Sequence, residues 1–535
     1  MKIKKLSFNV LERVCPRTFL LSVFLSLSFA IAYAAPGDLD SSFGMNGTVL
    51  TEFDRGTTAQ VVLVQPDSKI IIAGTVAFSN SPNNTSFAVI RFNSDGSLDS
   101  TFGTNGKVFT SILSRNGAGA GALQPDGKIL IGGSAENKFG LARYNQDGSL
   151  DLGFGEGGKV YTEFSASPLA AKIHSILIQP DGKIVAVGGN GNSSIYLAKY
   201  KSDGVLDSAF GDGGKVTTRY VSEGNIGESA LLQLDGKILI GGYINTNDSA
   251  TNSALFRYNT NGTLDSSFDG DGVAVYPMSG SHDSIKKILF RPDGKVITVG
   301  TANNIGQSVL NYALGVYNQD GTPDLSFGNN GVSILPAIGI TTIEDALLQS
   351  DGKIVIAGSK SNFNGSSQSS HSARFNSNGT FDFTFGNGGK VNLPIGFRSR
   401  GYAIAIQSDN KLLIAGSGYN LSLKAGFALS RLQGGDGQIP TLANITGRVI
   451  NEAGRGIGGV QVILSGGSPN LPRYVRTNPF GFYRFADLPV NSEYDLTVRS
   501  KKRASFQSSV HLLLNGNEYA EDLVFNYSTK PGTLE

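Results

Sequence analysis

The sequence predicts an all-β protein in which a seven-bladed β-propeller of four-stranded blades is followed by a small β-sandwich. Three observations predict the propeller: short motifs recur seven times, the composition favours short strands, and the first and last repeat units are complementary fragments. Repetition of a four-strand unit is typical of propellers, in which each unit forms one blade.

The composition indicates strands joined by tight turns. Of the 535 residues, 70 are glycine, none is tryptophan, and only 16% are charged. Valine, isoleucine and phenylalanine are frequent, and no long segment has the periodicity of an amphipathic helix. We therefore expect no substantial helical part.

Residues 1–34 resemble a secretory signal peptide. Basic residues precede the apolar run Phe19–Ile31, and Ala32-Tyr33-Ala34 offers the small residues of a cleavage site. The run is too short and too serine-rich for a membrane anchor, and Cys15 precedes it, whereas a bacterial lipoprotein cysteine would follow it. We expect cleavage after Ala34 and a protein that is secreted, periplasmic or associated with the cell surface, without a transmembrane anchor.

Removal of this segment limits the chemistry of the mature chain. The whole chain has a formal net charge of +2, and the segment contributes five basic residues and one acidic residue, so the mature chain carries −2. This charge gives no footprint for nucleic acid, which requires a clustered basic surface. The only cysteine also leaves, which excludes disulfides, a thiolate nucleophile and cysteine metal ligands.

Two motifs define the repeat. The first is Leu-Asp-x-x-Phe-Gly, with small departures, and its phenylalanines have a mean spacing of 57 residues, at positions 43, 102, 154, 210, 268, 327 and 385. The second is a Pro-Asp-Gly-Lys turn between apolar runs, with its aspartate or the equivalent residue at positions 67, 126, 181, 235, 293, 351 and 409. Proline presets one backbone dihedral of such a turn, and glycine accepts the positive φ that reverses the chain. An apolar strand such as "FAVIRFN" and an outer strand such as "GKVFTSI" complete four strands per unit.

The partial units at the two ends predict a closed ring. Leu39–Phe53 contains only a loop and a fourth strand, whereas residues 402–432 contain only the first three strands. The N-terminal strand can therefore complete the last blade, which removes the exposed strand edges that invite aggregation.

The period, the Pro-Asp-Gly-Lys hairpin and the Asp-Gly-x-Leu-Asp-x-x-Phe-Gly loop resemble the Delta-60 repeat of secreted bacterial β-propeller proteins. The resemblance covers roughly residues 37–437, within a propeller domain assigned to residues 35–437. It implies a propeller and brings no established catalytic residues.

A second domain follows a polar linker at residues 438–442. Alternating apolar residues between positions 443 and 527 predict a small β-sandwich, before a tail at residues 528–535. The segments "ITGRV", "GV" at 459–460 and "LP" at 488–489, with Tyr483 and Phe485, resemble carboxypeptidase regulatory-like, transthyretin-like domains. The resemblance implies a non-catalytic spacer or adaptor.

The repeat loop supports two interpretations. Its oxygen-bearing residues resemble half of an EF-hand calcium loop, and the first two complete sets are Asn93, Asp95, Asp99, Asn145, Asp147 and Asp151. However, no bidentate glutamate closes the loop, and Asn and Asp are also common in turns because their side chains bind nearby backbone N–H groups. We expect a turn and no cofactor, with calcium as the alternative.

The candidate ligand site is the mouth of the central channel. If the strand before each Pro-Asp-Gly-Lys turn is innermost, the position seven residues before the turn aspartate is polar and varied, whereas the positions three and five before it are almost wholly apolar. This column reads Gln60, Gly119, His174, Glu228, Lys286, Glu344 and Tyr402, and Asp345 follows one of its members. A ring of varied polar groups suits a ligand funnel, although strand starts can also simply be solvated.

These observations predict a non-enzymatic binding or scaffold protein. Its propeller face would bind a protein or glycan at the cell surface, and we expect a monomer. The alternative is a polysaccharide-active hydrolase or lyase in which Glu228, Glu344 and Asp345 supply the carboxylates. The four histidines have no metal-ligand spacing.

Overall fold

The structure is a computed structural model. It describes residues 34–53, 55–77, 84–164, 171–190, 194–220, 224–245, 250–279, 282–303, 310–337, 340–361, 368–393, 395–435, 442–450, 456–466, 473–478, 482–489, 492–499, 509–514, 518–519 and 523–524. The predicted signal peptide, apart from Ala34, and the predicted tail lie outside these residues. Of the predicted linker only Leu442 is described, and it is the first residue of a strand. The described part of the chain contains no helix that is long and apolar enough to cross a membrane.

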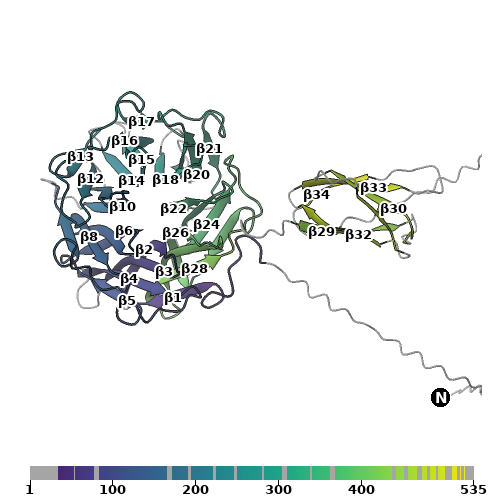
Figure 1. Cartoon of the computed structure of the whole chain (residues 1–535), viewed down its shortest axis with the longest axis horizontal. Helices are drawn as coiled ribbons and strands as arrows, with labels where there is room; N and C mark the ends of the chain where they lie inside the picture. The colour runs from purple at the N-terminus through teal and green to yellow at the C-terminus, as the bar shows by residue number, and fades with distance from the viewer. Residues whose placement is uncertain are drawn as a thin grey trace, which may run out of the picture. The chain divides into compact units, whose positions relative to one another are not determined.

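The described residues form seven four-stranded antiparallel sheets arranged in a ring, which confirms the predicted propeller (Figure 1). The strands of blades 1 to 3, from the centre outward, are β2 (Arg55–Val64), β3 (Ile70–Ala77), β4 (Thr85–Phe92) and β5 (Lys107–Thr110); β6 (Asn116–Leu123), β7 (Ile129–Ala135), β8 (Lys138–Tyr144) and β9 (Lys159–Thr162); β10 (Lys172–Ile178), β11 (Ile184–Gly189), β12 (Ile195–Tyr200) and β13 (Lys215–Thr218). The strands of blades 4 to 6 are β14 (Asn225–Leu232), β15 (Ile238–Asn245), β16 (Thr251–Tyr258) and β17 (Val273–Val275); β18 (Ser284–Phe290), β19 (Val296–Ala302), β20 (Asn311–Tyr317) and β21 (Val332–Leu335); β22 (Ile340–Leu348), β23 (Ile354–Ser361), β24 (Gln368–Phe375) and β25 (Lys390–Leu393).

Blade 7 combines the two ends of the propeller, as the partial units predicted. Its inner strands are β26 (Phe397–Ile406), β27 (Leu412–Tyr419) and β28 (Ala425–Leu432), and its outer strand is β1 (Thr48–Glu52). β1 pairs antiparallel with β28, with Thr48 opposite Ser430 and Glu52 opposite Gly426. The ring is therefore closed by backbone hydrogen bonds between segments at opposite ends of the propeller sequence.

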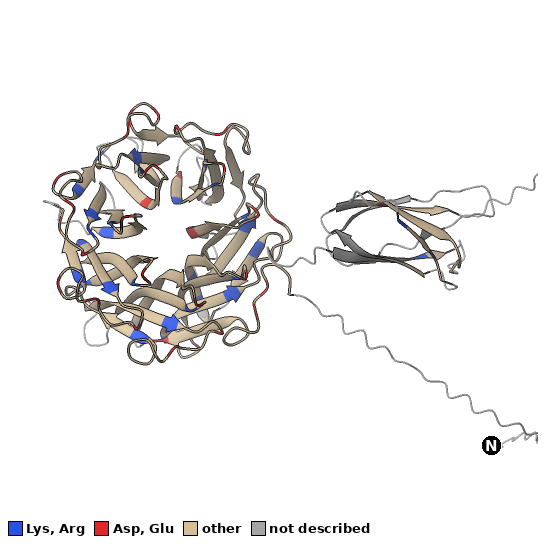
Figure 2. Ribbon diagram, viewed as in Figure 1, with Lys and Arg blue, Asp and Glu red and all other residues tan. Residues whose placement is uncertain are grey.

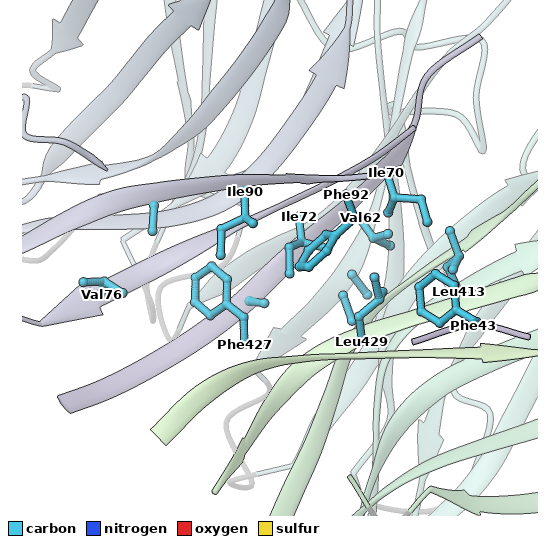
Figure 3. Close-up of a cluster of buried hydrophobic side chains, with 14 residues drawn as sticks. Phe43, Val62, Ile70, Ile72, Val76, Ile90, Phe92, Leu413, Phe427 and Leu429 are labelled. Carbon is cyan, nitrogen blue, oxygen red and sulfur yellow. The ribbon is translucent and has the colours of Figure 1, made fainter. Parts of the chain in front are cut away.

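The hydrophobic core lies between neighbouring blades. The middle strands are covered on both faces, so apolar residues run without alternation, and Ile70, Ile71 and Ile72 of β3 are all fully buried. Figure 3 shows such a cluster between blades 7 and 1, in which Phe427 and Leu429 approach side chains of blade 1. Packing between the first and last blades thus reinforces the strand pairing.

In each blade the aspartate of the Leu-Asp-x-x-Phe-Gly loop pairs with the lysine of the preceding turn, and in five blades an arginine of the third strand joins them; we call this group of charged residues the blade latch. In blade 1, Asp99 Oδ2 lies 2.7 Å from Arg91 Nε and 3.0 Å from Lys69 Nζ. The arginine also donates to a carbonyl of the next blade, at Gln146, and stacks over the loop phenylalanine Phe102. The complete latches are Arg91/Asp99/Lys69, Arg143/Asp151/Lys128, Arg257/Asp265/Lys237, Arg374/Asp382/Lys353 and Arg431/Asp40/Lys411.

The C-terminal domain has two sheets, as expected of a β-sandwich. One contains β32 (Phe482–Pro489), β29 (Leu442–Ile450), β35 (Glu518–Tyr519) and β36 (Leu523–Val524), and the other contains β31 (Arg473–Arg476), β30 (Gln461–Gly466), β33 (Ser492–Arg499) and β34 (Ser509–Leu514). Its core includes Val449, Val462, Leu464 and Phe485, each fully buried. The domain therefore has a hydrophobic core of its own.

Candidate functional site: the propeller channel

The seven innermost strands share one irregularity. At an equivalent point in each of them the register with the second strand shifts by one residue, so that the inner-strand residue there has no partner, as in a β-bulge; β2 and β26 have a further irregularity near their starts. The unpaired residues are Gln60, Gly119, His174, Glu228, Lys286, Glu344 and Tyr402. These are the seven positions of the predicted polar column. A bulge re-aims its side chain, so each blade places one variable residue at the same level of the ring.

A glycine in the second strand accompanies every bulge. A Cβ atom at Gly188 would lie only 1.9 Å from the carbonyl oxygen of Lys172, two residues before His174. The same contact, at 1.7–1.9 Å from an inner-strand carbonyl, would arise at Gly74, Gly133, Gly242, Gly300, Gly358 and Gly416. The bulge therefore depends on a backbone approach that no side chain permits at this position.

The bulge residues surround one cavity of about 510 Å³. Its lining includes all seven bulge residues and Asp345, so the structure brings together every residue of the predicted site. Figure 2 shows acidic residues on β14 and β22 and basic residues on β10 and β18, where these strands face the centre of the ring. The size is that of a small-molecule pocket; that these residues bind a ligand remains a prediction.

Three bulge residues of adjacent blades form a connected polar group. Glu228 Oε1 accepts a hydrogen bond from Lys286 Nζ at 2.6 Å, and its other oxygen lies 3.8 Å from His174 Nδ1. The same Nδ1 lies 2.9 Å from the carbonyl oxygen of Gly227. Because a carbonyl can only accept, Nδ1 carries the proton and a neutral His174 leaves Nε2 as an acceptor.

The environment of this group sets its charges. Burial lowers the pKa of His174 below its usual value, and the charge of Glu228 opposes this only in part, so the ring is neutral at pH 7. Burial alone would raise the pKa of Glu228, but the nearby positive charge of Lys286 and its hydrogen bond to the carboxylate outweigh this effect and lower that pKa. Glu228 and Lys286 therefore form an ion pair inside the channel.

Glu344 has a different environment. Its side chain is open to solvent within the channel, yet the surrounding protein raises its pKa, and the charge of Lys286 offsets only part of this effect. Among the described residues, no basic group lies within ion-pair distance of its carboxylate. Of the two glutamates of the predicted site, Glu228 is therefore paired with a lysine and has a lowered pKa, whereas Glu344 has no such partner among the described residues and has a raised pKa.

Asp345 lines the cavity, but it also braces the ring. Its Oδ1 lies 2.7 Å from Lys287 Nζ and accepts a hydrogen bond from the Ala346 amide, whereas its Oδ2 accepts one from the amide of Ile404 in blade 7. Both oxygens are therefore engaged in contacts within and between blades. This leaves Asp345 less free to meet a ligand than the sequence prediction assumed.

The sequence prediction missed Lys172, which also lines the cavity. Lys172 lies two residues before the bulge of blade 3, and its Nζ donates to Gln60 Oε1 in blade 1 at 3.3 Å. Its side chain passes Gly119, where a Cβ atom would lie 2.5 Å from Lys172 Cε. The glycine of blade 2 thus makes room for a lysine from blade 3, a relation that only the three-dimensional neighbourhood reveals.

The residues of the calcium alternative are placed as in turns. Asp95 Oδ1 accepts hydrogen bonds from the amide and hydroxyl of Ser97, and Asp147 makes the same pair with Ser149. Asn93 and Asn145 donate to the hydroxyl oxygens of Ser97 and Ser149, the same hydroxyls that donate to Asp95 and Asp147. Asp99 and Asp151 are the aspartates of their blade latches. In the described part of the chain, no group of three or more His, Cys, Asp or Glu residues is arranged to hold a metal ion.

Comparison with known families agrees with both predicted resemblances. The family described as "Domain of unknown function (DUF5122) beta-propeller" matches residues 65–102, 124–154, 179–210, 233–268 and 349–385. The carboxypeptidase regulatory-like domain matches residues 444–524. No curated protein matches the sequence.

Several solved structures are similar to this chain in architecture. Virginiamycin B lyase from Staphylococcus aureus is 13% identical with a TM-score of 0.41, over 72% of this chain and 99% of the lyase. A PL25 ulvan lyase is 11% identical with a TM-score of 0.36, over 75% and 92%. The gluconolactonase XC5397 from Xanthomonas campestris is 9% identical with a TM-score of 0.33, over 70% and 98%. Identities and scores this low assign none of these activities to the present chain.

Proposed function

We propose that this chain, which joins a repeat β-propeller to a carboxypeptidase regulatory-like domain, is a secreted, non-enzymatic binding protein. Its ligand site is the channel ringed by the seven bulge residues, and its C-terminal sandwich acts as a spacer or adaptor. The observation that carries the proposal is that every blade uses a bulge to direct its most variable inner residue to the same cavity. A fold needs no such variability for stability, so variation confined to the cavity is best explained by recognition.

The test compares channel variants with a variant elsewhere on the ring. Gln60→Ala, His174→Ala and Tyr402→Ala should each weaken binding of a hit from glycan and peptide arrays by about tenfold, the loss of one good polar contact, while the melting temperature changes little. Leu234→Ala is the matched control, because Leu234 is fully exposed in a turn and does not line the cavity. Equal affinity of all four variants would exclude the channel as the binding site.

Catalysis on polysaccharides is the second candidate. Glu344 with its raised pKa and Glu228 with its lowered pKa lie in one cavity, and two carboxylates with divergent pKa values suit an acid and its partner. Against it, Glu228 is already neutralised by Lys286 at 2.6 Å. Turnover of any glycan in a broad panel by the wild type, lost in both Glu228→Gln and Glu344→Gln, would establish the enzyme. Absence of turnover by the wild type would remove its support.

A further inference from the structure

The charges that line the channel sum to zero. Three lysines and three carboxylates line the cavity: Lys172, Lys286, Lys287, Glu228, Glu344 and Asp345. His174 adds no charge at neutral pH, because burial holds its pKa below the usual value. A ligand with a large net charge of either sign would therefore meet as many repulsive as attractive groups.

Two of the three lysines form ion pairs with two of the three carboxylates, so one lysine and one carboxylate of the lining have no ion-pair partner among the described residues. Lys286 pairs with Glu228 at 2.6 Å, and Lys287 pairs with Asp345 at 2.7 Å. Among the described residues, neither Lys172 nor Glu344 has an oppositely charged partner within 4.0 Å. Lys172 instead reaches the neutral amide of Gln60, and Glu344 is hydrogen-bonded to Thr342.

The two unpaired groups lie in places that disfavour their charged forms. Burial lowers the pKa of Lys172, and burial raises the pKa of Glu344. Lys172, which is half-buried, would thus gain more from an opposite charge brought by a ligand than it would on an open surface, because the screening by water is reduced. The side chains belong to blades 3 and 6, which are separated by blades 4 and 5 on one side of the ring and by blades 7, 1 and 2 on the other.

From this arrangement we propose that the channel binds a short peptide with free termini, whose carboxylate pairs with Lys172 and whose ammonium group pairs with Glu344. The inference rests on the proposed binding function and specifies its ligand. A zwitterion matches the net-zero lining, and a short peptide carries its two charges at opposite ends, where they can meet two groups on non-adjacent blades. A polyanionic glycan fits poorly, because three carboxylates line the cavity.

The test uses the full mature protein and ligands whose charges can be removed one at a time. Diglycine, triglycine and tetraglycine are compared with their N-acetylated and C-amidated forms by calorimetry at low salt. The variants are Lys172→Met and Glu344→Gln. Lys201→Met and Glu156→Gln are the matched controls, since both residues are exposed and neither lines the cavity.

The proposal expects at least one uncapped peptide to bind the wild type, with about tenfold weaker binding after either cap. Lys172→Met should abolish the effect of amidation and Glu344→Gln should abolish the effect of acetylation, whereas the controls retain both effects. Failure of all uncapped peptides to bind, or capped and uncapped forms binding equally, would overturn it. Binding of an uncharged oligosaccharide that is lost in Tyr402→Ala would also overturn the peptide inference, while leaving the channel as the binding site.

Discussion

At the scale of single residues, the aspartates of the repeat loops hold protein groups. The amide and hydroxyl of Ser97 occupy one oxygen of Asp95, and Arg91 and Lys69 share one oxygen of Asp99. Hydrogen bonds and positive neighbours lower the pKa of both carboxyl groups, although burial opposes the shift of Asp99 most strongly. The carboxylates are thus compensated without a metal ion.

Chelation of calcium is therefore expected to leave stability unchanged. A ligand that binds only the folded state raises the free energy of unfolding, so its removal must lower the melting temperature. Thermal unfolding with excess EDTA and with added calcium should give the same midpoint. A clear fall with EDTA that calcium reverses would restore the calcium interpretation of the loops.

Substitution of the aspartate in the latch of blade 7 should lower the free energy of unfolding strongly. Asp40→Asn would leave Arg431 and Lys411 without their shared carboxylate, and loss of one partner of a buried ion pair costs about 3 kcal/mol. The control is Asp324→Asn in blade 5, where Val316 occupies the arginine position and only Lys295 faces the aspartate. Urea denaturation should show the larger loss for Asp40→Asn; equal losses would mean that the arginine contributes little.

The blade latches could be predicted only in part from the sequence. The sequence places the aspartate in the repeat loop and the arginine in an apolar strand such as "FAVIRFN", but their pairing depends on how the third strand and the loop fold back on each other. The spacing of eight residues in four of the five complete latches, as between Arg91 and Asp99, is an available signal in the sequence. Lys172 had none, since its role depends on the absence of a side chain at Gly119 in another blade.

At the scale of elements, the bulge allows the innermost strand both to pair with the second strand and to line the cavity, with different residues for each. Residues on either side of it, such as Ala59 and Val61, pair with β3 and are buried, whereas Gln60 is unpaired and lines the cavity. The chain can therefore vary the lining without altering the ladder that holds the blade together.

Substitution of the glycine opposite a bulge should damage the blade. In Gly188→Ala the new Cβ would meet the carbonyl oxygen of Lys172 at 1.9 Å, and a backbone atom cannot give way as a flexible side chain can. We expect a loss of about 3 kcal/mol in the free energy of unfolding, at the upper end for overpacking. Gly56→Ala is the control, because a Cβ there meets nothing within 4 Å. If Gly188→Ala were as stable as Gly56→Ala, the close approach would not be a requirement.

The elements themselves were largely predictable from the sequence. The four strands of each unit and the polar column follow from the repeat, because identical units must occupy equivalent positions in a ring, whereas the identity of the innermost strand was an assumption that the structure confirms. The bulges could not be predicted in this way, because the pattern of apolar residues does not show which residue lacks a partner in the neighbouring strand. The glycine that recurs inside the second strand, as at Gly74 and Gly133, is the signal that could have indicated them.

At the scale of the whole molecule, the seven latch aspartates make the propeller sensitive to acid. The latch contacts lower the pKa of all seven, and that of Asp40 falls from 3.8 to about 2, against the opposing effect of burial; the seven are Asp40, Asp99, Asp151, Asp207, Asp265, Asp324 and Asp382. Carboxyl groups with a lower pKa in the folded state stabilise it above their unfolded pKa and lose this contribution as the pH falls.

Stability should accordingly be constant above about pH 5 and fall steeply between about pH 4 and pH 2. For Asp40 alone the shift corresponds to about 2 kcal/mol. Melting temperatures measured across this range should show the fall, and Asp40→Asn should show a smaller one. A melting temperature that is independent of pH between 4 and 2 would contradict the role of the latches.

Closure of the ring makes a second prediction at this scale. A mature chain that begins at Arg55 lacks β1, so the edge of β28 loses its partner and is free to pair with another molecule. We expect a lower melting temperature and self-association in light scattering. A synthetic peptide of residues 37–53, added in trans, should restore both, whereas a scrambled peptide should not. A monomeric truncated chain of unchanged stability would show that β1 is dispensable.

The pairing of β1 with β28 also has a consequence for biosynthesis. Thr48 leaves the ribosome about 380 residues before its partner Ser430, and at the usual pace of synthesis this interval lasts roughly 20–80 s. During that time the first strand has no native partner, and every blade made so far ends in an incomplete ring. The propeller can therefore be finished only after nearly all of it has been translated.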